Sequence, residues 1–296
     1  MLREDPYTKG ADIMAVFYNQ ATLTYNGGVT NSNIVSGEVI GTLTAEKTAV
    51  NSTYTVGDEV TYIVSLVNSG STSFTGLTVT DDLGAYELGA LTVVPLDYVE
   101  GTLRYYVNGV LQAAPAVTAG PPLTVTGISV PAGGNAVIVY DARVNAYASP
   151  ETGGNVVNTV TVTGNGITNP VTATETVTAE DAARLAITKS LTPTTVPENG
   201  EITYTFIIQN SGSAAVTAAD AAVVTDLFDP VLDITSVTFN GTAWAAPTNY
   251  TYDTAGNFST VAGQITVPAA TFTQDPATGL WTTTPGISTL VVTGTV

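Results

Sequence analysis

The sequence predicts an all-β protein made of two tandem immunoglobulin-like β-sandwiches. Of its 296 residues, 53 are threonine and only 11% are charged, a composition that favours sheets over helices. Short segments that alternate polar and apolar residues recur along the chain between Gly, Asn and Pro turn signals. Their order occurs twice, and the chain is long enough for two domains that each bury a core.

Composition also excludes several classes of function. The chain has no cysteine and no histidine, so it lacks disulfides, thiolate nucleophiles and the commonest general base and metal ligand. A net charge of −18 argues against a nucleic-acid partner. The chain also has no stretch of about 18 apolar residues that would span a membrane. We therefore expect a protein that is not an enzyme and has no cofactor and no metal site.

An internal repeat defines the two sandwiches. Residues 43–83 contain LTAEK, GDEVTYIVSLVNSG and LTVTDDL, and residues 185–227 contain LAITK, NGEITYTFIIQNSG and VVTDL in the same order. Further on, GGNAVIVYDARV at 133–144 matches PGISTLVVTGTV at 285–296. Alternation predicts that one face of each strand points into the core. The expected inward residues are Val60, Tyr62, Val64 and Leu66 in the first copy, and Ile202, Tyr204, Phe206 and Ile208 in the second.

The two copies end differently. In the first, Val144 is followed by a loop and by NTVTVTGNG at 158–166, which is typical of the last strand of a sandwich. The second copy stops at Val296, the position equivalent to Val144, without such a strand. A matching segment, NQATLTYNG at 19–27, instead precedes the first copy. We expect it to lie in a donor strand whose inward residues are Phe17, Asn19, Ala21, Leu23 and Tyr25.

This pattern divides the chain into five expected segments. They are an N-terminal tail at 1–13, a donor strand with a linker at 14–38, a first immunoglobulin-like domain at 39–166, a linker at 167–183, and a second domain at 184–296. The second domain is incomplete and is the expected acceptor of the donor strand.

A sandwich without its last strand exposes unpaired backbone groups and an open apolar core. A strand from another chain would bury about four or five apolar side chains there, at roughly 1.5–3 kcal/mol each. Because donor and acceptor lie at opposite ends of the chain, such donor-strand complementation joins chains head to tail. Closure within one chain would strain residues 26–42, which would have to span the first domain. We therefore expect a homopolymer.

Three residue types recur at inward positions of both copies. A buried lysine can lose its proton and attack an asparagine side-chain amide, while a buried acid polarises that amide, which gives an isopeptide bond. The candidates are Lys47, Asn158 and Asp81 in the first domain, and Lys189, Asp226 and Asn19 of a neighbouring chain in the second. The alternative is that each lysine keeps its ammonium in water, each asparagine caps a turn and each aspartate ends a strand.

The sequence also resembles a known family. The run TVGDEVTYIVSLVNSGSTSFTGLTVTDDL, followed by ISVPAGGNAVIVYDARV and NTVTVTG, resembles the immunoglobulin-like surface repeat termed domain of unknown function eleven. The second unit resembles it too, and the opening MAVFYNQATLTYNGGVTNSNIV is similar to the N-termini of clostridial members. The resemblance implies a structural role at an extracellular surface. Spore appendages, which are made without a secretion signal, provide an analogy for a spore-surface location.

Together these observations predict a structural subunit of an extracellular or spore-surface filament. The subunits would assemble head to tail by donor-strand complementation and would be locked by Lys–Asn isopeptide bonds. The alternative is an adhesin or surface-layer module whose missing strand comes from sequence outside this chain.

Overall fold

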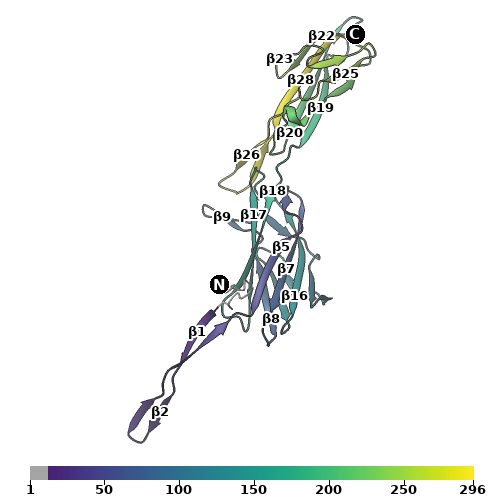
Figure 1. The fold of residues 1–296 in the computed structure, drawn as a ribbon. Coiled ribbons are helices and arrows are strands. Elements are labelled where there is room, and N and C mark those ends of the chain that lie inside the picture. Colours follow the sequence, from purple (N-terminus) through teal and green to yellow (C-terminus); the bar gives the residue numbers. More distant parts are fainter. Residues whose placement is uncertain (1–12) are drawn as a thin grey trace, which may run out of the picture. The chain divides into compact units, whose positions relative to one another are not determined.

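The computed structural model describes residues 13–296, and in this part β-strands dominate, which confirms the all-β prediction (Figure 1). One short 3-10 helix, Ala218–Asp220, is the exception among the described residues. The chain divides into two compact units. The first runs to Ala148 and includes Asn155–Thr178, and the second contains Ser149–Gly154 and Ala179–Val296.

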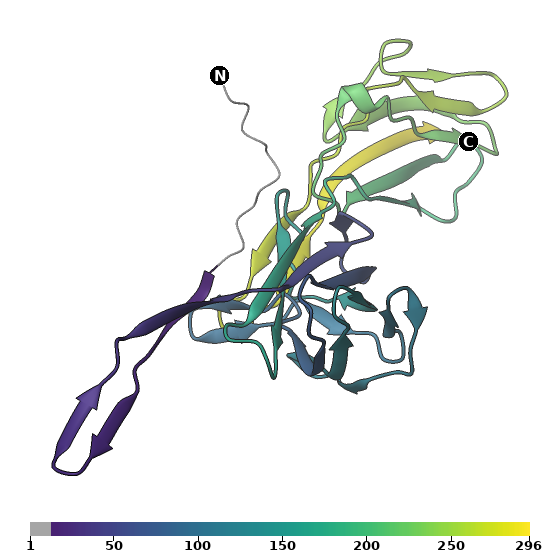
Figure 2. The same cartoon turned by 60° about the horizontal axis from the view of Figure 1, so that its bottom comes forward.

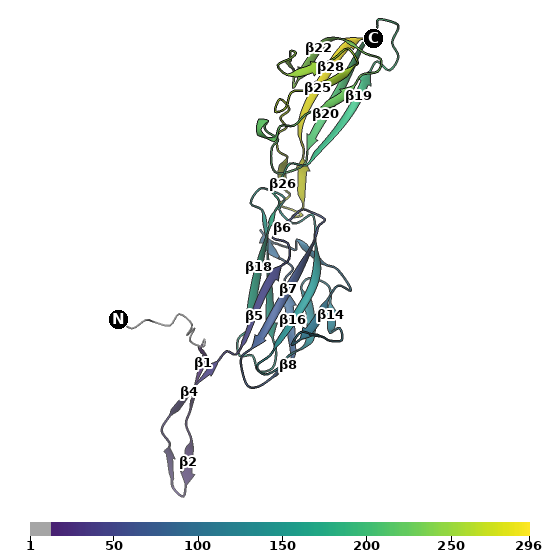
Figure 3. The same cartoon turned by 45° about the vertical axis from the view of Figure 1, so that its right-hand side comes forward.

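The described chain begins with a long hairpin (Figures 2 and 3). Strand β1 (Ile13–Asn19) pairs antiparallel with β4 (Val35–Ile40), and β2 (Thr22–Tyr25) pairs with β3 (Gly28–Asn31). The turn at its tip contains Gly27, whose φ of +87° suits glycine. Large side chains sit on glycines across the hairpin, Phe17 on Gly37 and Tyr25 on Gly28.

Two expectations for this region were wrong. The expected linker half of 14–38 forms β3 and β4, because Asn26-Gly27 is a two-residue hairpin turn that returns the chain onto β1. The expected donor strand is also interrupted between Asn19 and Thr22, so it consists of β1 and β2. Of the expected tail at 1–13, Ile13 opens β1, and residues 1–12 lie outside the described residues.

The first unit is a complete β-sandwich of two six-stranded sheets. One sheet has the order β13-β12-β16-β7-β5, with β11 also paired to β16, and the other has the order β14-β15-β8-β17-β18-β6. The first sheet contains β5 (Leu43–Ala49), β7 (Glu59–Asn68), β11 (Leu96–Tyr98), β12 (Arg104–Val107), β13 (Val110–Leu111) and β16 (Asn135–Val144). The second contains β6 (Thr53–Tyr54), β8 (Phe74–Asp81), β14 (Ala116–Thr118), β15 (Leu123–Val130), β17 (Asn155–Thr163) and β18 (Val171–Ala179). A separate hairpin consists of β9 (Tyr86–Leu88) and β10 (Leu91–Val93).

The core of the first unit follows the predicted alternation. The four expected inward residues of β7 are all buried, which confirms that prediction: Val60, Tyr62, Val64 and Leu66. β7 lies beside β16 in the same sheet, where Tyr62 pairs with Tyr140. The two rings stack with centroids 5.7 Å apart. The Asn-Ser-Gly signal after β7 forms the expected turn, in which the buried Asn68 amide accepts from Gly70 and donates to backbone carbonyls.

Strand β18 corrects the expected linker at 167–183. It pairs with β17 over eight residues, from Asn155↔Thr178 to Val162↔Val171, and β6 covers its other edge. The sequence VTATETVTA alternates with period two, but its inward set contains Ala and Glu, so its apolar signal is weak. Its pairing with β17 covers an edge of β17 that would otherwise be unpaired.

The second unit has one full sheet and one fragmented sheet (Figures 1 and 3). The full sheet has the order β19-β20-β28-β22-β23, a second sheet has the order β21-β25-β24, and β26 and β27 form a separate hairpin. Their bounds are β19 (Leu185–Thr192), β20 (Glu201–Asn210), β22 (Asp233–Phe239), β23 (Thr242–Ala243), β28 (Gly286–Thr295), β21 (Thr225–Leu227), β24 (Tyr250–Tyr252), β25 (Asn257–Thr260), β26 (Thr271–Gln274) and β27 (Trp281–Thr284). Of the expected inward residues of β20, Ile202, Phe206 and Ile208 are buried, and Tyr204 is half-buried.

Strand β21 of the second unit has one open edge. It pairs with β25 on one side, and among the described residues of this unit no strand occupies its other side, where β8 of the first unit is paired with β17. The inner face of β19 is open as well. Leu185 is 48% exposed, whereas its counterpart Leu43 on β5 is 6% exposed. Among its described residues, the second sandwich therefore has no counterparts of β17 and β18.

This difference predicts unequal local stability in the unassembled chain. Amides of β19 and β21 should exchange with solvent about tenfold faster, or more, than amides of β5 and β8, because fewer buried contacts oppose local opening. Hydrogen-exchange mass spectrometry on the full chain at low concentration measures this ratio. Equal protection of the two pairs of strands would contradict the prediction.

Candidate Lys–Asn–Asp sites

The structure brings the three candidate residues of the first unit into one buried cluster. Lys47 lies on β5, Asp81 ends β8, and Asn158 lies on β17. The Lys47 Nζ is 2.6 Å from Asp81 Oδ2, with 0% and 3% of the two side chains exposed. Asn158 is fully buried. Lys47 therefore does not keep its ammonium in water, as the alternative interpretation would require.

A tyrosine that the sequence analysis did not assign to the site joins the acid to the asparagine. The Tyr140 hydroxyl donates to Asp81 Oδ2, and the Asn158 side-chain amide lies 3.5 Å from the same hydroxyl. A second ring lies beside the amine, since Lys47 Nζ is 4.9 Å from the ring centroid of Tyr62. The signal for Tyr140 was its inward position on β16 opposite Tyr62, but its contact with Asp81 depends on how the two sheets face each other.

Burial sets the electrostatics of this cluster. Desolvation lowers the pKa of Lys47, although the negative charge of Asp81 opposes this shift. Desolvation also raises the pKa of Tyr140, so this phenol remains a hydrogen-bond donor. The pKa of the neighbouring Asp82 is raised for the same reason, against the hydrogen bonds that it accepts from Thr159 and Gly84. A buried amine with a lowered pKa is the state in which lysine acts as a nucleophile.

The asparagine carbonyl in this cluster is unsatisfied. Asn158 Oδ1 is buried and has no hydrogen-bond partner within the described structure. Leaving such an acceptor unpaired costs about 1–3 kcal/mol. The site thus holds an amine with a lowered pKa, a carboxyl group in contact with it and an amide whose oxygen is free to accept a proton. These are the groups that an exchange of the asparagine amide for a lysine amide requires.

The second unit contains two of the three groups. Lys189 on β19 forms an ion pair with Asp226 on β21, as Lys47 does with Asp81. Aromatic rings line the amine, with the centroids of Tyr204 and Phe228 at 4.5 and 5.3 Å from Lys189 Nζ. The Lys189 side chain is 38% exposed to solvent, in contrast to the enclosed Lys47.

The third group lies elsewhere in the chain. Asn19 is exposed at the end of β1, where it pairs with Val35 of the N-terminal hairpin. No strand equivalent to β17, and therefore no residue equivalent to Asn158, belongs to the described part of the second unit. Tyr140 also has no counterpart, since Val292 occupies the position opposite Tyr204. The second site is therefore open and incomplete within its own unit.

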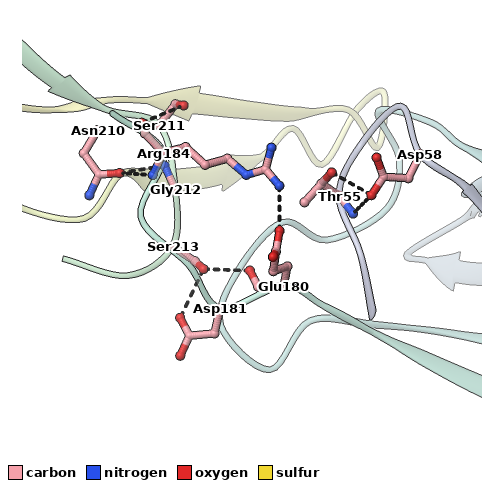
Figure 4. Close-up of polar contacts among 9 residues, drawn as sticks. All are labelled: Thr55, Asp58, Glu180, Asp181, Arg184, Asn210, Ser211, Gly212 and Ser213. Atoms are coloured by element: carbon pink, nitrogen blue, oxygen red, sulfur yellow. Dashed lines mark hydrogen bonds and ion pairs between the residues drawn. The ribbon is translucent and has the colours of Figure 1, made fainter. Parts of the chain in front are cut away.

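Polar contacts near the start of the second unit are structural (Figure 4). The buried amide oxygen of Asn210 accepts from the backbone N–H groups of Arg184 and Gly212, which fixes the second Asn-Ser-Gly turn. The Arg184 guanidinium pairs with Glu180 at 2.6 Å. In the first unit, the Asp58 carboxylate accepts from Thr55 and closes a separate turn. These groups are satisfied by one another.

Comparison with known proteins yields structural likeness only. No family model and no curated protein matches the chain. Among solved structures, the full-length RrgB pilus protein of Streptococcus pneumoniae has a TM-score of 0.34 and 13% identity, over 93% of this chain and 46% of that one. The major pilin subunit BcpA of Bacillus cereus gives 0.33 and 12%, over 92% and 73%. A 35 kDa fragment of the major pilin GBS80 of Streptococcus agalactiae gives 0.35 and 10%, over 82% and 91%.

The chain thus spans about half the length of the pneumococcal protein that it matches. Scores this low leave the function to be decided by the residues of the chain itself. Among its described residues, no helix is long and apolar enough to cross a membrane.

The first-unit cluster predicts a change in mass. We expect the unassembled chain to weigh less than its sequence by one ammonia, because Lys47 and Asn158 are enclosed together with Asp81. Intact-mass spectrometry of the denatured chain measures the difference. The bond should not form in Lys47→Arg, Asn158→Ala or Asp81→Ala, so each variant should have the full mass calculated from its own sequence. The matched control Lys189→Ala should leave the loss unchanged, and an unmodified wild-type chain would contradict the bond.

Tyr140 predicts an effect on the rate of the same reaction. Tyr140→Phe keeps the stacked ring and removes the hydroxyl that joins Asp81 to Asn158, so ammonia loss should slow by about tenfold or more without being abolished. A refolding time course sampled by mass spectrometry gives the rate. The control is Tyr105→Phe, which removes another hydroxyl with a backbone partner, at Ser129, outside the cluster. A Tyr140→Phe rate equal to that of the wild type would contradict the role of the hydroxyl.

Proposed function

We propose that this chain is the structural subunit of a filament in which the N-terminal strand of each subunit completes the second sandwich of the next. One observation carries the proposal. The β-sandwich is built twice in this chain, and the second copy leaves open the face that the first copy buries, with Ile187 54% exposed. An open apolar face beside an unpaired strand edge is a site for addition of a strand.

The N-terminal segment has the properties of a donor. Its apolar side chains are exposed in the single chain, including Phe17 at 54% and Leu23 at 63%. Burying about four such side chains would contribute roughly 1.5–3 kcal/mol each, before the entropy cost of association. Donor and acceptor are different surfaces, so the contact between subunits is heterologous. Such contacts build an open filament unless the subunits close into a ring. The net charge of −18 keeps free subunits apart.

A covalent lock would follow from docking. The match of Asn19 to Asn158 puts Asn19 of the neighbouring subunit beside Lys189 and Asp226. Asp226 takes a proton from the lysine ammonium, and the neutral amine attacks Cγ of Asn19. The Nζ–Cγ bond forms, the Cγ–Nδ2 bond breaks, and the leaving nitrogen collects two protons and departs as ammonium. The lysine ammonium and the carboxamide thus become one secondary amide and one ammonium ion.

The same cluster within the first unit would close each subunit internally through Lys47 and Asn158. A fibre with both bonds would be continuous in covalent structure, which suits a filament exposed at an extracellular cell or spore surface. The resemblance of the sequence to surface repeats supports this location.

Electron microscopy of the purified 296-residue chain tests the proposal. We expect filaments from the wild type, because both surfaces are open, and none after deletion of residues 14–27. The matched control Lys189→Ala should still give filaments, but boiling in detergent should reduce them to monomers, whereas wild-type filaments should give a ladder. Filaments that persist after the deletion would refute the donor. A wild-type chain that stays monomeric would favour an adhesin or surface-layer module completed by sequence outside this chain.

A further inference from the structure

The opening in the second sandwich is two strands wide. In the first unit, β17 and β18 lie side by side between β8 and β6. In the second unit, β21 corresponds to β8. Residues 194–196 correspond to residues 52–54, which contain β6, when the two copies are aligned on Glu59 and Glu201. Among the described residues of this unit, neither a β17 nor a β18 equivalent lies between them, and residues 194–196 belong to no strand.

A single added strand would therefore leave the opening half filled. It would pair with β21 on one side and present a new unpaired edge on the other, which is the liability that β18 removes in the first unit. In that unit, Tyr54 of β6 is buried, whereas the equivalent Val196 is half-buried. The second sandwich thus lacks cover at both borders of the opening.

The N-terminal segment already has the form of a matching pair. β1 and β4 are antiparallel neighbours, as β17 and β18 are. Aligning Asn19 with Asn158 puts Phe17 at the position of Val156. The cross-strand partners of these two residues are Gly37 and Val177.

Side-chain size supports this correspondence. Val156 and Val177 are two medium-sized buried residues on one face of the first unit's hairpin. Phe17 and Gly37 are one large and one minimal residue at the equivalent pair, with the ring seated on the glycine. Directly opposed residues share a face, so both pairs present similar volume to the core.

We propose that the donated element is the whole hairpin of a second copy of this chain, with residues 21–24, which correspond to residues 160–163 of β17, on the open edge of β21 and β4 beside residues 194–196. This inference rests on the proposed function and deepens it. A hairpin that is paired before docking loses less conformational freedom than a free strand. Its two outer edges also match the two edges of the opening, so one insertion satisfies both.

The hairpin predicts a contact that donation of a single strand does not. Thr178 of β18 donates its backbone N–H to Ser52 beside β6, and the equivalent residues are Glu38 of β4 and Thr194. Because the chain has no cysteine, Glu38→Cys and Thr194→Cys form a unique pair, which a short bismaleimide can join. In a Lys189→Ala background, which removes the isopeptide ladder, treated filaments should give a detergent-stable ladder of chains.

The outcomes separate the two proposals. The matched control pairs Glu38→Cys with Thr283→Cys on the exposed β27 and should give no ladder. Two results together would overturn the hairpin and leave strand donation intact. The Glu38→Cys/Thr194→Cys filaments would give no ladder, and residues 35–40 of wild-type filaments would show no increased amide protection by hydrogen exchange. Absence of filaments from the wild type would overturn the proposed function itself.

A volume exchange gives an independent readout. Gly37→Val should slow filament growth by about tenfold or more, because the new side chain meets the Phe17 ring. The double variant Phe17→Val/Gly37→Val recreates the Val156–Val177 pair of the first unit and should recover most of the rate. If β4 stays outside the acceptor, the double variant should grow no faster than Gly37→Val, and that result would contradict the hairpin.

Discussion

The constraint on which this structure depends is that an apolar core and the strand edges that border it need to be covered. The first sandwich meets it internally, since β17 and β18 fill the space between β8 and β6. The second has a sheet, β19-β20-β28-β22-β23, with the same order as β5-β7-β16-β12-β13 of the first. Within its described residues, however, β21 is unpaired on one side and the inner face of β19 is open. The N-terminal hairpin has the reverse imbalance, with apolar residues such as Phe17 and Leu23 turned to solvent. The exposed apolar side chains of the hairpin and the open face of the second sandwich are complementary surfaces, and we therefore propose that chains associate head to tail.

The two lysine clusters illustrate the same constraint in chemical terms. Lys47 and Asp81 are enclosed by β17, and desolvation there lowers the pKa of the lysine. Lys189 and Asp226 have the same ion pair, but 38% of the lysine side chain remains exposed to solvent. The added strand would supply both the asparagine and the exclusion of water. In the proposed filament, bond formation would thus be tied to correct docking, because the amine would become a nucleophile only when the amide that it attacks has arrived.

Sequence patterns predicted the two sandwiches and the inward residues of β7, because strong alternation and a duplicated order of motifs need no knowledge of register. They did not predict β18 or β4. The inward set of β18 includes Ala173 and Glu175, and β4 carries Gly37, so neither strand has a continuous apolar stripe. β18 pairs with β17 and β4 pairs with β1. Such pairing cannot be inferred from the composition of the paired strand itself. Tyr140 was missed for the same reason, since its contact with Asp81 crosses from one sheet to the other.

A hairpin donor resolves a difficulty that a single strand would create. A lone inserted strand closes one edge and opens another, so each junction would still expose a template for unspecific pairing. The first unit avoids this by following β17 with β18 and covering β18 with β6. A two-stranded donor closes the edge of β21 and the edge at residues 194–196 together. It also fixes register, because a slip of one residue would move Asn19 away from Lys189 and turn Phe17 outward. Strand pairing and bond chemistry would then select the same alignment.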